Sequence, residues 1–208
     1  VYIVNPNNPT GSIFSSNDLS DLINKNKNIL FIIDEAYFEF SNVTLSSFVS
    51  ELNNLLISRT FSKAFALASF RIGYLISCSD NIELINRIRN PKNISLFAQE
   101  AAISALDDLN YTKNYVKEVN KAKTTFMKFL KTLNWMNPIK GKGNFIFIRL
   151  DSIQMKKDLI NYLKKNKIFI RDYGHIKKTE KYIRITIGTL SQMQIVKNHI
   201  NKFVKLSK

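Results

Sequence analysis

The sequence predicts an α/β fold in which a mainly parallel sheet is followed by a smaller α+β domain. In the first half, short apolar runs rich in β-branched residues alternate with helical patterns, and these runs lie at residues 2–4, 29–33, 55–57 and 72–76. Runs of this length between turn residues are typical of strands buried on both faces of a parallel sheet. After residue 133 strands and helices alternate over a shorter length, which indicates a second lobe.

Two helices are expected in the first half. The first lies at residues 19–24, and its expected N-cap is Ser16 or Asn17, because their side-chain oxygens can accept bonds from free backbone amides. The second covers residues 81–89 and ends before Pro91, since proline cannot continue a helix.

A long helical stretch connects the two halves. Residues 95–133 contain no glycine or proline, which predicts either one spine or two consecutive helices between the lobes. We place the domain boundary so that residues 1–113 form the C-terminal part of the larger domain and residues 114–208 form the small one. The small domain is expected to contain strands at residues 145–150, 168–170 and 182–187 and helices at residues 155–166 and 191–205.

The composition bears on partners and compartment. The net charge is +15, which would suit a nucleic-acid or membrane surface, but the lysines are spread over the chain without interleaved aromatic residues. Solvated helix faces are therefore the favoured interpretation, with neither nucleic acid nor membrane as a partner. The single cysteine excludes an intramolecular disulfide, and with two histidines a compact zinc cluster is not expected. A lone cysteine also suits a reducing, cytoplasmic location.

The beginning of the chain is unusual. Val1 stands in place of methionine and opens directly into the first apolar run, so no preceding element would shield that strand. The sequence therefore predicts a fragment, with an incomplete larger domain.

Lys63 and Asp34 are candidates for chemistry. Lys63 lies between apolar residues, and a desolvated setting favours the neutral amine that a Schiff base requires. Asp34 follows the apolar run at residues 29–33, and the carboxyl end of a parallel strand faces the crevice where ligands bind in such sheets. A helix N-cap or turn is the simpler alternative for Asp34.

Other polar residues could complete such a site. Tyr37 follows Asp34 by three residues and could either bind a ligand or belong to the core. The NPNNPTG segment at residues 5–11 is a turn by composition, from which an asparagine could also reach a ligand. Ser62 and Arg71 offer a hydroxyl and a guanidinium, which together can bind phosphate.

Arg71 has a simpler alternative, a surface ion pair. Its expected partners in that case are Asp80 and Glu83. Each of these indications is weak alone, and their order along the chain is what makes them specific.

In that order the motifs resemble those of fold-type I pyridoxal-phosphate-dependent transferases, in the histidinol-phosphate aminotransferase group. The matching segments are NPNNPTG at 5–11, IDEAY at 33–37, RTFSKAFALASFRIGY at 59–74, GNFI at 143–146, IFIRDY at 168–173 and YIRITIGT at 182–189. The resemblance covers essentially the whole chain and implies that the family's N-terminal part is missing. Ser69 and Phe70 depart from it, since a Gly-Leu pair is common before the arginine.

The resemblance implies a function. The cofactor would be pyridoxal 5'-phosphate, and the reaction would be transfer of an amino group from histidinol phosphate to 2-oxoglutarate in histidine biosynthesis. The partners would be a small anionic amino substrate, a 2-oxo acid and a second copy of the chain in a homodimer. Two alternatives remain open: a decarboxylase of a phosphorylated amino acid such as threonine phosphate, and an inactive fragment or basic binding protein.

The resemblance also implies residue roles. Lys63 would carry the cofactor as a Schiff base and move the proton during catalysis. Asp34 would pair with the ring nitrogen, and Asn8 and Tyr37 would hold the ring hydroxyl. Retention of these residues argues against decay to an inactive protein.

Further implied roles concern anions. Ser62 and Arg71, with help from Thr60, would hold the cofactor phosphate. Arg184 resembles the family's main substrate-anion arginine, and Arg171 resembles a second arginine that lines the substrate phosphate end. The alternation of Arg184 with apolar neighbours also allows it simply to face solvent.

Overall fold

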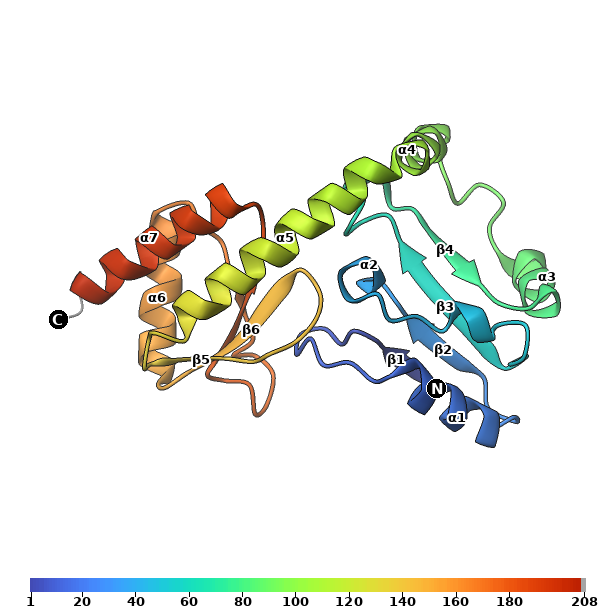
Figure 1. Ribbon diagram of the computed structural model, residues 1–208, viewed down its shortest axis with the longest axis horizontal. Coiled ribbons are helices and arrows are strands. Elements are labelled where there is room, and N and C mark those ends of the chain that lie inside the picture. The colour runs from blue at the N-terminus through green and yellow to red at the C-terminus, as the bar shows by residue number, and fades with distance from the viewer. Residues whose placement is uncertain (207–208) are drawn as a thin grey trace. The chain divides into compact units, whose positions relative to one another are not determined.

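The computed structural model describes residues 1–206, which form two compact units (Figure 1). Unit 1 comprises residues 1–8 and 12–116, and unit 2 comprises residues 9–11 and the chain from residue 117 onwards. This division and the boundary expected at residue 113 both fall within one helix, α5 (Leu109–Leu130).

Unit 1 contains a four-stranded sheet in sequence order. Its strands are β1 (Tyr2–Val4), β2 (Phe31–Asp34), β3 (Leu55–Thr60) and β4 (Gly73–Ile76). The expected parallel arrangement is confirmed for β1, β2 and β3. The fourth strand runs antiparallel to β3, so the sheet is mixed.

The α1 helix (Ser16–Lys25) supports this sheet. Its apolar face, with Leu19 and Ile23, packs in a buried cluster with Ile33, Leu55 and Ile57. Burying side chains of this size contributes about 1.5–3 kcal/mol each.

The expected N-cap of that helix, Ser16 or Asn17, was wrong by one or two residues. Ser15 is the N-cap, and its hydroxyl accepts a bond from the Asp18 amide. Serine and asparagine stand side by side at residues 15–17, and the sequence alone could not distinguish which oxygen faces the first turn.

The remaining helices of unit 1 follow the sheet strands. They are α2 (Phe38–Ser41), α3 (Ser79–Ile88), α4 (Leu96–Asp107) and the first part of α5, with short 3-10 turns at Ser46–Phe48 and Ala68–Phe70. The long helical stretch is thus two helices, since α4 ends at its C-cap residue, Asp108. The change of direction between α4 and α5 is visible in Figure 1. This outcome matches the second of the two expected alternatives.

Unit 2 is an antiparallel sheet with helices. The strand order is β5 (Met136–Pro138), β6 (Phe145–Leu150), β8 (Tyr182–Thr186) and β7 (Arg171–Asp172), and the helices are α6 (Ile153–Lys165) and α7 (Leu190–Leu206). The α6 helix packs on α7 and on β6 (Figure 1). This is the α+β arrangement that the sequence predicts.

Two strands of unit 2 differ from expectation. The strand expected at 168–170 was wrong, because pairing with β8 begins at Arg171, after Lys167 adopts a left-handed backbone with φ +61°. The β5 strand was not predicted, because Asn137 and Pro138 indicate a turn. Proline is tolerated there because β5 is an edge strand. No helix within residues 1–206 is both long and apolar enough to cross a bilayer.

Candidate active site

The carboxyl edge of the unit 1 sheet gathers the segments that carry the predicted cofactor residues. Because β1, β2 and β3 are parallel, the chain leaves all three at the same edge, after Val4, Asp34 and Thr60. The antiparallel β4 enters at that edge, since Thr60 pairs with Gly73. The predicted cofactor residues on these segments are Asn8, Asp34, Tyr37, Thr60, Ser62, Lys63 and Arg71.

The loop that carries Lys63 is firmly anchored. The Leu67 amide donates to the Phe61 carbonyl at 2.9 Å, and the Phe61 amide donates to the Ile72 carbonyl at 3.2 Å. Phe61 and Ile72 are buried in a cluster with alanines of α4. Lys63 is itself half-buried, and its Nζ lies 5.6 Å from the centroid of the Tyr37 ring, which is 5% exposed. The structure therefore brings this amine and this phenol together.

Asp34 has a fixed carboxylate. Its Oδ1 accepts a bond from the Ala36 amide at 2.9 Å, and its Oδ2 accepts a bond from the Tyr2 hydroxyl. Partial burial and the bond to Asp34 raise the pKa of Tyr2 to about 12, so this hydroxyl remains a donor. The sequence did not single out Tyr2, because its meeting with Asp34 depends on the pairing of β1 with β2. Because Asp34 accepts a bond from the backbone amide of Ala36, it also stabilises the turn after β2, which was the simpler role considered for it.

The asparagine-proline loop is closed by a residue outside the predicted set. Asn5 is fully buried, and its side chain donates to the Phe14 carbonyl at 3.1 Å and accepts from the Phe14 amide at 2.9 Å. The backbone N–H of Asn5 also donates to the backbone carbonyl of Asp34 at 2.9 Å. Asn8 lies exposed within the loop that this clamp closes.

The residues predicted to bind the cofactor phosphate, Thr60, Ser62 and Arg71, lie around the loop that carries Lys63. The Thr60 hydroxyl accepts from the Ser62 amide at 3.0 Å, which places both side chains at the start of the loop. Arg71 is exposed, has a left-handed backbone with φ +54°, and donates from Nη1 to the Ala68 carbonyl at 3.2 Å. The alternative ion pair of Arg71 is absent from the part of the chain that the structure describes, where Glu83 instead pairs with Arg87.

The two arginines predicted to bind the substrate lie on neighbouring strands of unit 2. Arg171 of β7 lies directly opposite Arg184 of β8 in the antiparallel register. The Arg184 guanidinium also lies 5.2 Å from the Phe145 ring centroid. Like charges on opposed strand positions repel each other, and an anion that binds both would relieve the repulsion.

An ion pair between a buried lysine and an exposed aspartate anchors the short strand β7. Lys156 is 2% exposed and pairs with Asp172, the neighbour of Arg171. Its ammonium and the Gly174 amide hold the pKa of Asp172 below its usual range, against the effect of burial. The position of Arg171 is therefore supported from the core of unit 2.

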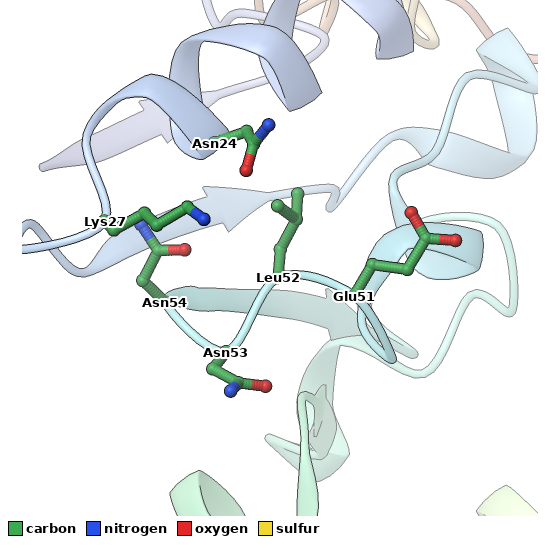
Figure 2. Close-up of a pocket in the computed structure, with 6 residues that line it drawn as sticks. All are labelled: Asn24, Lys27, Glu51, Leu52, Asn53 and Asn54. Atoms are coloured by element: carbon green, nitrogen blue, oxygen red, sulfur yellow. The ribbon is translucent and has the colours of Figure 1, made fainter.

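A separate hollow lies at the opposite, amino ends of the unit 1 strands (Figure 2). It has a volume of about 350 Å³ and is lined by Asn24, Lys27, Glu51, Leu52, Asn53 and Asn54. The Asn54 amide donates to the carbonyls of Ile23, Asn26 and Ile29, so it serves to end α1 and hold the following turn. None of the predicted site residues lines this hollow.

Comparison with known proteins places the chain in a family. The model of the family "Aminotransferase class I and II" matches residues 1–200. The chain belongs to this aminotransferase family. It resembles the dihydroxyacetone phosphate transaminase Cj1437c of Campylobacter jejuni, with 46% identity over 99% of this chain and 55% of that protein. The histidinol-phosphate aminotransferase of Thermotoga neapolitana is 35% identical over 98% of the chain and 58% of the relative.

A solved structure agrees with this family. The histidinol-phosphate aminotransferase of Sinorhizobium meliloti, in complex with pyridoxal-5'-phosphate, superposes with a TM-score of 0.89 at 25% identity. The match covers 100% of this chain and 58% of the other chain. The chain thus spans little more than half the length of the relatives it matches. The expected fold class is confirmed by this likeness.

The residues at the sheet edge of this chain fit the chemistry of pyridoxal phosphate. The cofactor needs an amine for its aldehyde, an anion for its ring nitrogen and donors for its phosphate. Lys63 supplies the amine, and the Asp34 carboxylate is held in place by Tyr2 and Ala36. Arg71 supplies an exposed guanidinium on the segment that enters β4.

Glu39 of α2, close to this edge, predicts a pH effect on stability. Burial raises its pKa to about 7, and within residues 1–206 its Oε2 is buried without a hydrogen-bond partner. The native state therefore holds a proton that the unfolded chain releases between pH 4.5 and 7, so stability falls as the pH rises through this window.

The measurement for Glu39 is urea unfolding of wild type and Glu39→Gln from pH 5 to pH 8. We expect the stability of wild type, relative to the variant, to fall by about 2 kcal/mol across this range, after allowance for partial exposure. A stability difference that stays constant with pH would show that Glu39 is charged in the native state.

Proposed function

We propose that the protein is a pyridoxal-phosphate-dependent aminotransferase of a small phosphorylated substrate. The observation that carries this proposal is the meeting of Lys63, Tyr37 and Asp34 at the carboxyl edge of the sheet, with the Lys63 amine 5.6 Å from the Tyr37 ring. Family membership gives independent support. When bound, the cofactor supplies an electron sink for the charge left when the substrate loses its α-proton.

Each residue then has a defined task. Lys63 attaches the cofactor and carries the proton at its Nζ, for which a half-buried amine is suited. Asp34 holds a positive charge at the ring nitrogen, while Tyr37 and Asn8 bind the ring hydroxyl. Thr60, Ser62 and Arg71 bind the cofactor phosphate.

We assign Arg171 and Arg184 to the substrate anion. Their direct opposition on β7 and β8 creates a site of two positive charges, and planar guanidinium groups bind phosphate or carboxylate oxygens in pairs. Such a site suits both a phosphorylated amine and a dicarboxylic oxo acid such as 2-oxoglutarate.

Two substrates fit this proposal. Histidinol phosphate is the substrate expected from the sequence motifs, and a relative 35% identical is named for it. Dihydroxyacetone phosphate is the second candidate, because the relative named for its transamination is 46% identical. In both, the carbon that carries the amino or keto group is bonded to a CH2–O–phosphate group, so a single phosphate site would serve either one.

Other features of the whole protein belong to the same proposal. We expect a cytoplasmic homodimer, as the family that the sequence motifs resemble implies. The alternative of a phosphoamino-acid decarboxylase uses the same cofactor residues but breaks a different bond. The alternative of an inactive fragment or basic binding protein predicts neither cofactor attachment nor turnover.

The test is a substrate panel on the full-length protein that contains this chain. The amines are histidinol phosphate, serinol phosphate (the amine that corresponds to dihydroxyacetone phosphate), their unphosphorylated forms and threonine phosphate. Glutamate formation from 2-oxoglutarate and CO2 release are both measured. We expect transamination with a kcat/KM at least about 100-fold higher for a phosphorylated amine than for its unphosphorylated form. Because the dihydroxyacetone phosphate transaminase is the more similar relative, we expect serinol phosphate to give a higher kcat/KM than histidinol phosphate.

Arginine variants, measured with the same substrates, test which residues bind the substrate phosphate. Arg184→Gln and Arg171→Gln should raise KM for the phosphorylated amine roughly 10- to 100-fold, because each removes a charge-assisted bond. Arg149→Gln is the matched control, since Arg149 is exposed on β6. CO2 release from threonine phosphate without transamination would support the decarboxylase, and no turnover of any amine would refute the enzyme assignment.

A further inference from the structure

Glu35, Arg59 and Thr44 form a buried charged network next to the segments that carry the predicted cofactor residues. Glu35 is completely buried and Arg59 has a side chain 10% exposed. Both belong to the sheet edge described above, but the proposed function gives neither of them a role.

Glu35 has partners on both carboxylate oxygens. Its Oε2 accepts from Arg59 Nε at 3.0 Å and from the Thr44 hydroxyl at 2.8 Å. Arg59 Nη2 lies 2.9 Å from the same oxygen as an ion pair. Its Oε1 accepts from the Leu45 amide at 2.8 Å. The guanidinium thus bonds Glu35 through Nε and Thr44 through Nη2, and these two bonds fix its orientation.

Arg59 is held from three further directions. Its Nη2 donates to the Thr44 hydroxyl at 2.6 Å, and its guanidinium carbon lies 3.7 Å from the centroid of the Phe38 ring. Burial opposes its charge, but the hydrogen bond with Tyr74 and the Glu35 carboxylate outweigh burial and raise the pKa of Arg59. The Arg59 guanidinium therefore stays charged at neutral pH.

The network joins the two segments on which the proposed site depends. Glu35 immediately follows Asp34 on the segment that leads to Tyr37, and Arg59 immediately precedes Thr60 on the segment that leads to Lys63. The β2–β3 register, in which Asp34 pairs with Ser58, places Glu35 next to Arg59. A ligand bound by both segments needs their separation fixed to within about 0.5 Å.

The network lies on the other side of β2 from Asp34. Successive side chains of a strand point to opposite faces, so Glu35 shares a face with Ile33, which packs with Leu45 in the core. Asp34 points to the opposite face, toward Tyr2. Glu35 and Arg59 therefore act on a ligand bound at Asp34 through the backbone.

We propose that Glu35 and Arg59 are positioning residues that hold the Asp34–Tyr37 segment and the Thr60–Lys63 segment in register for the cofactor. This inference rests on the proposed function. A purely stabilising role predicts that an apolar pair of similar volume would replace them without loss, because buried ion pairs often contribute no more stability than such pairs. A positioning role predicts that the apolar pair restores stability but not function.

The experiment compares variants of the full-length protein. They are Arg59→Met, Arg59→Lys, the double variant Glu35→Leu/Arg59→Met, and Arg87→Met as control. Arg87 also pairs with a glutamate in unit 1, but with side chains 66% and 68% exposed. The measurements are Tm, kcat and KM for the best amine, and the pH titration of the visible absorbance of the lysine-bound cofactor.

We expect Arg59→Met to lower Tm, because it leaves the Glu35 charge buried and unpaired. The double variant should recover Tm, yet kcat should stay at least about ten-fold below wild type, with a changed pH titration of the absorbance. Arg59→Lys should recover only part of the activity, because lysine cannot form the two-bond geometry. Arg87→Met should behave as wild type.

Two outcomes would overturn the inference. A double variant with recovered Tm, wild-type kcat and an unchanged titration would show that the network only stabilises the fold. A wild-type protein that attaches no cofactor would overturn the proposed function and this inference with it. The two failures are distinguished by the wild-type absorbance alone.

Discussion

Replacing Lys63 with alanine is expected to abolish covalent attachment of pyridoxal phosphate and to lower kcat by at least about 1,000-fold. The expected size follows from the loss of proton transfer, which alone contributes about 100- to 10,000-fold, together with the loss of the covalent link. The fold should survive, because the loop is anchored by Phe61 and Ile72 rather than by the lysine side chain.

Lys25→Ala is the matched control for this variant. Lys25 is exposed in the last turn of α1, remote from the carboxyl edge of the sheet. It should leave cofactor absorbance and turnover unchanged. A Lys63→Ala protein that still attaches the cofactor with wild-type stoichiometry would show that another lysine is the reactive one.

Replacing Asp34 with asparagine is expected to lower kcat by about 100- to 1,000-fold with little change in stability. Asparagine keeps the shape, and its carbonyl can still accept the bond from the Ala36 amide. Its NH2 group then faces the Tyr2 hydroxyl, whose oxygen can accept a bond in place of the one it donates to Asp34. Asparagine loses the negative charge that stabilises a protonated ring, and removal of one electrostatic group of this kind costs about 2.7–4 kcal/mol. Steady-state rates and urea unfolding on the same samples provide the comparison.

Asp21→Asn is the control for charge removal, since Asp21 is exposed on α1. If Asp34→Asn kept full activity, the carboxylate would have only the turn role that its bond to Ala36 already gives it. A large loss of stability in Asp34→Asn would likewise point to a structural role.

The fold class was predictable because its determinants are local. Continuous apolar runs such as residues 31–33 and 145–148 are buried almost throughout, and they identify strands without knowledge of their neighbours. The expected domain boundary remains a prediction, as do the residue roles at the site. The N-cap at Ser15 and the start of β7 at Arg171 were missed because they depend on backbone geometry at single residues.

The sequence could not predict which side chains meet across strands. Asp34 was found from its place after an apolar run and Lys63 from its apolar neighbours, and the order of the motifs supported both. Tyr2 was missed because its bond to Asp34 exists only when β1 lies beside β2. The pair of Glu35 and Arg59 was missed for the same reason, although opposite charges near the ends of two adjacent strands are a usable indication once the register is known.

The central claim is that Lys63 is the lysine that carries pyridoxal phosphate. The most direct measurement is to add pyridoxal phosphate to the purified full-length protein, reduce it with borohydride and locate the modified lysine by peptide mass spectrometry. We expect stoichiometric labelling at Lys63 alone, and no labelling in Lys63→Ala. Labelling scattered over exposed lysines, or none at all, would contradict the assignment of this sheet edge as an active site.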